Sequence, residues 1–182
     1  MIRRLATLTV ACAAFALVAR SNPALAGSNT ATLNTTASVV GNCSTITPNP
    51  GSIAFGSYDP FTYPSGTPLK DATAAVFSTN CTLNDSISWT VGIGNNCGKG
   101  SVAADRAMTD GASHYLSYEL YQNSSDTTAW AYGASCGAPT GVSQTGGGTG
   151  TANTISVYGL IPGGQNVYQA SYSDSVVITV SY

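Results

Sequence analysis

Short runs in which apolar and polar side chains alternate recur along the chain, separated by turn-forming residues. The clearest run has four large apolar side chains at every second position: Ile87, Trp89, Val91 and Ile93. Successive side chains of a strand point to opposite faces, so this run predicts a strand with one buried face. Two further stripes of the same kind are Leu116, Tyr118 and Leu120, and then Val176, Ile178, Val180 and Tyr182.

Weaker alternation predicts more strands, at residues 31–40, 52–56, 73–78, 128–132, 154–160 and 166–170. Turn signals rich in Pro and Gly lie between them, and no stretch keeps a helical period. Residues 137–150, which include the run GGGTG, are expected to form a flexible loop. Many short strands separated by such turns predict an all-β fold, either a sandwich or a barrel.

The N-terminus has the pattern of a secretory signal. Arg3 and Arg4 precede an apolar run at residues 5–19, and Ala24-Leu25-Ala26 follows it. The run is about fifteen residues long, shorter than the ~20 that a membrane-spanning helix needs. We therefore expect residues 1–26 to be cleaved, and the mature chain to be exported rather than an integral membrane protein.

Removing residues 1–26 changes the charge balance. Lys70, Lys99 and Arg106 remain as the basic residues against eight acidic ones, which argues against a nucleic-acid partner. Ten tyrosines and a hydrophobic share of 43% argue against disorder. The chain is therefore predicted to form a folded domain with a weakly charged surface.

Four cysteines remain after the signal: Cys43, Cys81, Cys97 and Cys136. Their spacing lacks the short Cys-x-x-Cys pairs of zinc sites, and export favours disulfides. Four cysteines allow three pairings, and the sequence alone leaves all three open. We favour Cys43 with Cys81 and Cys97 with Cys136, each closing a loop of about 40 residues and contributing roughly 4 kcal/mol in the chain-entropy model.

No set of residues points to catalysis. His114 is the sole histidine and has no Gly-x-Ser-x-Gly elbow beside it. The acidic pairs Asp105 with Asp110 and Asp59 with Asp71 read as turn-forming, and no calcium-loop spacing is present. We expect no catalytic residue, metal or cofactor. An alternative is a sugar-binding module that uses Trp130, Tyr132 and Tyr63 as stacking surfaces.

Three segments together resemble a known family. They are TASVVGNCSTI around Cys43, YLSYELYQNSSDTTAW from Tyr115 to Trp130, and VYGLIPGGQNVYQASYSDSVVITVSY at the C-terminus. The chain resembles the spore coat protein U family, which includes the secreted pilins of archaic chaperone-usher systems. The resemblance implies a disulfide between Cys43 and Cys81, and it implies the second pair less securely.

The resemblance also implies a fold and a mode of assembly. Pilins of this type have an immunoglobulin-like β-sandwich that lacks its final strand. A periplasmic chaperone first fills the open groove, and the N-terminal strand of the next subunit then replaces it at an outer-membrane usher. The implied partners are thus identical or related subunits, the chaperone and the usher.

Two parts of the sequence suit this mechanism. Residues 27–40 carry no Pro and no charge, and they would donate one alternating face: Ala31, Leu33, Thr35, Ala37 and Val39. An ordinary first strand of the chain's own sandwich is the alternative for this segment. The chain stops on the predicted strand 175–182, so we expect Val176, Ile178, Val180 and Tyr182 to form the strand at the edge of the groove that binds the chaperone.

The resulting prediction is a non-enzymatic structural subunit of a secreted pilus or coat, made of a donor segment at 27–40 and a pilin domain at 41–182. Such a subunit would lie in a cell-surface fibre or coat and serve adhesion or biofilm formation. The alternative is an extracellular lectin-like or tip-adhesin sandwich that binds carbohydrate.

Overall fold

The structure is a computed structural model that describes residues 27–101, 106–148 and 150–182. The predicted signal at 1–26 lies outside the described residues. The chain divides into two units, Met1–Ala37 and Ser38–Tyr182. The described part of the first unit, residues 27–37, is exposed and has no regular secondary structure.

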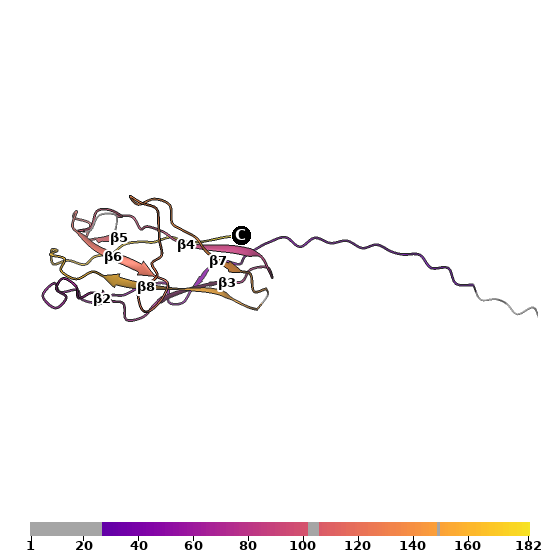
Figure 1. Cartoon of the computed structure of the whole chain (residues 1–182), viewed down its shortest axis with the longest axis horizontal. Coiled ribbons are helices and arrows are strands. Elements are labelled where there is room, and N and C mark those ends of the chain that lie inside the picture. The colour runs from indigo at the N-terminus through magenta and orange to yellow at the C-terminus, as the bar shows by residue number, and fades with distance from the viewer. Residues whose placement is uncertain (1–26, 102–105, 149) are drawn as a thin grey trace, which may run out of the picture. The chain divides into compact units, whose positions relative to one another are not determined.

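The second unit is a β-sandwich of two antiparallel sheets (Figure 1). Its strands are β1 (Thr47–Pro48), β2 (Leu69–Lys70), β3 (Ala75–Thr79), β4 (Ser86–Val91), β5 (Arg106–Thr109), β6 (Tyr115–Tyr121), β7 (Val142–Thr145), β8 (Asn153–Ile161) and β9 (Ile178–Ser181). The residues that the structure describes contain no helix. The predicted all-β sandwich is confirmed.

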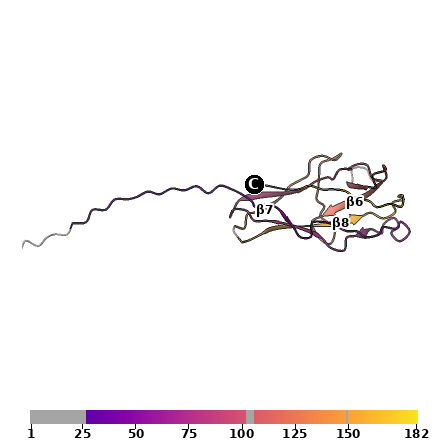
Figure 2. The same cartoon turned by 180° about the vertical axis from the view of Figure 1, so that it is seen from behind.

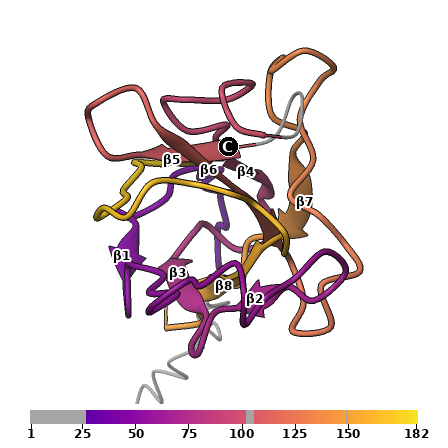
Figure 3. The same cartoon turned by 90° about the vertical axis from the view of Figure 1, so that its left-hand side faces the viewer.

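The larger sheet has the order β1-β3-β8-β6-β5, and β2 also pairs with β8. The smaller sheet has the order β7-β4-β9. Strands β6 and β8 run side by side in the larger sheet, as the reverse view shows (Figure 2). The view along the strands shows them arranged around the core, with β1 and β7 on opposite sides (Figure 3).

The core lies between the two sheets, and the alternating stripes supply it. Ile87, Trp89 and Val91 of β4 are buried, as are Ile155 and Val157 of β8. Burial of one such side chain contributes about 1.5–3 kcal/mol, so these stripes hold the sheets together.

Several strand predictions are wrong. Residues 31–40, 52–56 and 166–170 form no strand, and 128–132 forms isolated bridges only. The predicted loop 137–150 instead contains β7, which pairs with β4. Strand β7 has a weak apolar pattern because it is a short edge strand whose side chains are half-buried or exposed, so periodicity alone does not reveal it.

Candidate functional site

A groove opens along the core of the sandwich. One hollow of about 400 Å³ lies between residues 51–55 and residues 172–178. A second hollow of about 860 Å³ continues between residues 53–60 and residues 167–172. The two hollows share Ile53, Phe55, Met108 and Tyr172, so they form one continuous groove.

We call residues 51–58 the first edge of the groove. They belong to no strand. Ile53 and Phe55 are half-buried, whereas Ala54 between them is exposed. This is the alternation of a strand that lies on the core without a strand partner. A Cβ at Gly159 of β8 would lie 2.6 Å from the Phe55 ring, so any larger residue there would displace this ring of the first edge from the sheet.

We call residues 172–178 the second edge. Ser173 pairs with Thr109 of β5, and Ile178 begins β9, but residues 174–177 are assigned to no strand. Val176 and Ile178 are half-buried and line the groove, whereas Val177 between them is 71% exposed. Inward side chains that stay only half-buried show that the core is open here.

The floor of the groove is apolar. It is formed by side chains of β3, β5, β6 and β8, which include Phe77, Met108, Tyr118, Leu120 and Val157. Phe77 and Met108 stay half-buried, whereas Tyr118, Leu120 and Val157 are buried, so water reaches the floor at the first two side chains.

Asp174 fixes the second edge to the sandwich. Its carboxylate accepts hydrogen bonds from the Tyr118 hydroxyl, at 2.7 Å, and from the Asn95 backbone N–H, at 3.0 Å. Burial raises the pKa of Tyr118 well above its usual value, and the bond to Asp174 adds to the rise, so the hydroxyl stays a donor. Gly94, at a φ of 78°, leaves room for this carboxylate.

The predicted groove-edge residues lie at different depths. Val176 and Ile178 line the groove, Val180 is half-buried, and Tyr182 is 60% exposed and lies outside the groove lining. The predicted donor residues Ala31, Leu33, Thr35, Ala37 and Val39 are all exposed, Leu33 and Val39 at 85% each. We call residues 27–40 the donor segment, after the role predicted for them from the sequence.

Both disulfides are present in the sandwich. Cys43 is bonded to Cys81, and Cys97 is bonded to Cys136, which are the two pairs favoured from the sequence. Neither bridge lines the groove.

The first edge and Asp174 were not predicted as site residues. Ile53 and Phe55 carry a detectable signal, since they alternate with Ser52 and Ala54, but this pattern predicts an ordinary strand. Asp174 has no signal of its own in one sequence, because its two partners are 56 and 79 residues away.

The residues of the sugar-binding alternative do not form a surface platform. Trp130 is 2% exposed, and its indole N–H points to the Ser156 carbonyl oxygen. Tyr132 and Tyr63 are half-buried, and Tyr63 stacks on Tyr58. The interpretation of Trp130 as a stacking surface is therefore wrong, because its ring fills the core.

The chemistry-bearing residues are scattered. His114 bonds through Nδ1 to Asp110 and stacks on Tyr168, and Asp105 lies outside the described residues. In the part of the chain that is described, no cluster of three His, Cys, Asp or Glu side chains is arranged to hold a metal ion. The same part contains no helix long and apolar enough to cross a membrane.

The fold and the groove define a class of β-sandwich whose core is open between two edges. The chain belongs to the Spore Coat Protein U domain family, whose sequence model matches residues 29–179. Protein U of Myxococcus xanthus is similar to it, at 37% identity over 93% of each chain.

One solved structure is also similar: the chaperone–tip adhesion subunit pre-assembly complex from the archaic chaperone-usher Csu pili of Acinetobacter baumannii. The match has a TM-score of 0.43 and 14% sequence identity. It covers 79% of the present chain but 40% of the chain in that complex.

Proposed function

We propose that the protein is a structural subunit of a secreted fibre or coat, in which the donor segment of one copy fills the groove of the next. The open groove carries this proposal. It leaves apolar side chains such as Ile53, Met108 and Val176 only half-buried beside edges that belong to no strand, and an inserted strand would cover these side chains and pair with the edges.

The composition of the donor segment supports this role. Its 14 residues would span about 45 Å as a strand, at ~3.3 Å per residue. Leu33 and Val39 are apolar yet 85% exposed, so their burial in a partner would be favourable. With neither proline nor charge, the segment could pair along its whole length.

The arrangement is directional. A donor segment near one end of the chain and a groove formed elsewhere make a head-to-tail contact, which need not close and therefore extends into a fibre. We further propose that residues 1–26 direct export and that a periplasmic chaperone occupies the groove before an outer-membrane usher promotes exchange. The assembled product would be a cell-surface fibre or coat with a role in adhesion or biofilm.

A matched pair of substitutions in the donor segment tests the proposal. Leu33→Asp puts a charge on the face to be buried, whereas Asn34→Asp puts the same charge on the other face. We expect Leu33→Asp to abolish fibres seen by electron microscopy and Asn34→Asp to retain them. Deletion of residues 27–40 should leave a folded subunit that cannot add to a fibre, and normal fibres from that deletion would contradict the proposal.

A further inference from the structure

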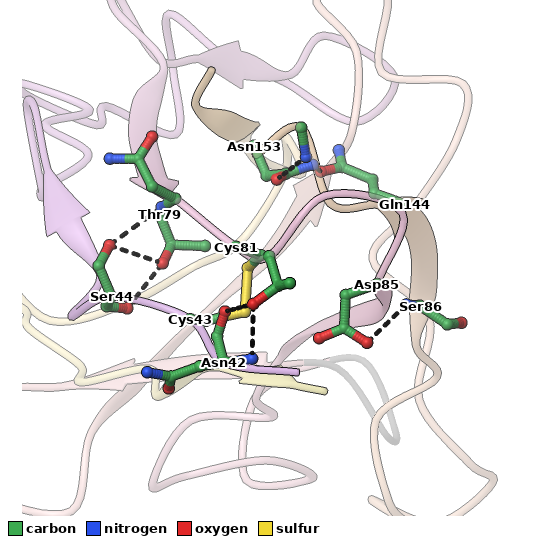
Figure 4. The surroundings of a disulfide bond; sticks show 12 residues. Asn42, Cys43, Ser44, Thr79, Cys81, Asp85, Ser86, Gln144 and Asn153 are labelled. Atoms are coloured by element: carbon green, nitrogen blue, oxygen red, sulfur yellow. Dashed lines mark hydrogen bonds between the residues drawn. A yellow bond between two sulfur atoms is a disulfide. The ribbon is translucent and has the colours of Figure 1, made fainter. Parts of the chain in front are cut away.

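The residues that follow the donor segment are fastened to the end of β3 and the turn after it (Figure 4). Thr82 N–H donates to the Asn42 carbonyl oxygen at 2.9 Å, and Asn42 N–H donates to the Thr82 hydroxyl at 3.0 Å. Ser44 N–H donates to the Asn80 carbonyl oxygen at 2.8 Å. We call this contact between residues 42–44 and 80–82 the anchor.

Side chains and close packing strengthen the anchor. The Thr79 hydroxyl donates to the Ser44 carbonyl oxygen at 2.6 Å, and the Ser44 hydroxyl accepts from Asn80 N–H at 3.0 Å. A Cβ at Gly41 would lie 2.5 Å from Oδ2 of Asp85, so the chain reaches the anchor through a position that admits only glycine without rearrangement.

A covalent bond crosses the centre of the anchor. Cys43 is bonded to Cys81, 38 residues further on, and Cys81 is 3% exposed. The loop that this bond closes contains β1, the first edge of the groove, β2 and β3. The disulfide therefore connects the residues after the donor segment covalently to the end of β3. This covalent path does not pass through the first edge.

We infer that Cys43–Cys81 carries tension from the donor segment directly into the larger sheet and keeps the first edge of the groove free of load. This inference rests on the proposed function, because a subunit is pulled at Asn42 only if its donor segment is held in another copy. Each subunit in the fibre would give its donor segment to one neighbour and receive a donor segment from the other neighbour. The first edge must therefore stay in place under tension, because it lines the groove that holds the received segment.

The sheet is oriented to bear such a load. β3 and β8 are antiparallel, with Thr79 opposite Asn153. Cys81 follows β3 at the Asn153 end of β8, so a pull between Cys81 and the Ile161 end of β8 acts along the two strands in opposite directions. The five pairs between β3 and β8 are then loaded in shear and resist the pull together. Without the disulfide, the same pull would be resisted only by the hydrogen bonds of the anchor and the two pairs of β1, and would then reach the first edge, which belongs to no strand.

Force measurements on single secreted chains test the inference. One handle is placed at Ser28 and the other at exposed Asn166, just beyond the far end of β8. In the Cys43→Ser/Cys81→Ser variant, we expect an early extension at low force of up to about 130 Å, the extended length of the released loop. The oxidised wild-type chain should lack this step.

The second disulfide provides a matched control. Cys97–Cys136 spans 39 residues, almost the same length, but does not enclose the first edge. The Cys97→Ser/Cys136→Ser variant should resemble the wild type at low force. The inference is overturned if the Cys43→Ser/Cys81→Ser variant lacks the early step or if both variants show it.

A second arm keeps both disulfides. A protease site is inserted at the exposed turn around Phe61, inside the Cys43–Cys81 loop, and the folded chain is cut there. The disulfide is then the covalent link between the handles, and we expect the force of the first event to be unchanged; a clear fall would overturn the inference. Fibre formation by the wild type is scored separately by electron microscopy, so a failure to assemble counts against the proposed function while the force traces judge the load path.

Discussion

Arg106 joins the two sheets. It lies on β5 of the larger sheet, is fully buried, and forms an ion pair with Glu119 of β6. Its Nε–H also donates to the Gly92 carbonyl oxygen, next to β4 of the smaller sheet, at 2.9 Å. A buried charge with such partners is costly to disturb, because removal of one member leaves the other uncompensated.

Arg106→Met should therefore destabilise the protein by about 3 kcal/mol, the low end of the range for breaking a buried pair. Chemical denaturation measures the free energy of unfolding. Lys99→Met is the control, because Lys99 is exposed and the loss of its cation–π contact with Tyr115 should cost at most about 1 kcal/mol. An equal effect of the two substitutions would contradict this account of Arg106.

The hydrogen bond from the His114 ring lowers the pKa of Asp110 below its usual value of 3.8. A carboxyl with a depressed pKa adds stability that is present above the unfolded pKa and is lost as the pH falls through the folded pKa. Stability from this pair should thus be complete at neutral pH and disappear only in acid, below about pH 4.

His114→Phe keeps a ring that can stack on Tyr168 but removes the nitrogen that bonds Asp110. We expect the pKa of Asp110 to rise toward its usual value, as followed by NMR titration of its side-chain carboxyl carbon. Asp59 is the internal reference, because the Thr62 hydroxyl lowers its pKa and His114 takes no part. A pKa of Asp110 that does not move would disprove the role of His114.

At the scale of the elements, the two edges of the groove lie against the core, although residues 51–58 and 174–177 belong to no strand. Val176 and Val177 are neighbours on the second edge, but Val176 lines the groove and Val177 is 71% exposed. This opposition allows one test in which the same substitution is made on the two faces of the edge.

Val176→Glu should prevent assembly, because it puts a charge where a donor strand would pack, and burying an unpaired charge is costly. Val177→Glu should leave assembly intact. Fibre yield is the measurement, and thermal unfolding of each subunit verifies that both remain folded. Equal fibre yields from the two variants would mean that the second edge takes no part in subunit contacts.

Strong alternation predicts elements well in this chain. The stripes of Ile87, Trp89 and Val91 and of Leu116 and Leu120 became β4 and β6, since one face of each strand is buried against the other sheet. The same pattern at Ile53 and Phe55 predicts a strand that does not form. Alternation reports a side chain's contact with the core, whereas a strand also needs a partner for its backbone.

Side-chain partners distant in sequence could not be predicted. The side-chain amide of Gln165 accepts a hydrogen bond from the Ser117 N–H and donates one to the Ser117 carbonyl oxygen, 48 residues away. Nothing in the sequence near Gln165 indicates these two bonds. Arg106 looks in sequence like one of the few surface charges, but it is buried between the sheets. Such roles depend on topology, which one sequence does not contain.

For the whole molecule, the central feature is a sandwich with an open groove in a chain that also carries the exposed segment 27–40, which we propose to be donated to another copy. An open core is unfavourable for an isolated subunit, because apolar side chains that line it, such as Phe77, Met108 and Val176, stay half-buried and contact water. Filling it with a segment of another copy would stabilise both the subunit and the contact between subunits, so assembly and completion of the fold would be one event. The Cys43–Cys81 bridge would then let such a fibre bear tension without opening its own grooves.

Photo-crosslinking from the donor segment tests this central claim most directly. A photoreactive side chain at Leu33 in assembled fibres is expected to crosslink to residues of the groove in a different copy, such as Met108, Val157 or Val176. Mixed fibres of light and heavy isotope-labelled chains distinguish crosslinks between copies from those within one copy by mass spectrometry. Crosslinks to groove residues of another copy are the predicted result, and crosslinks found only outside the groove or only within one chain would contradict the account.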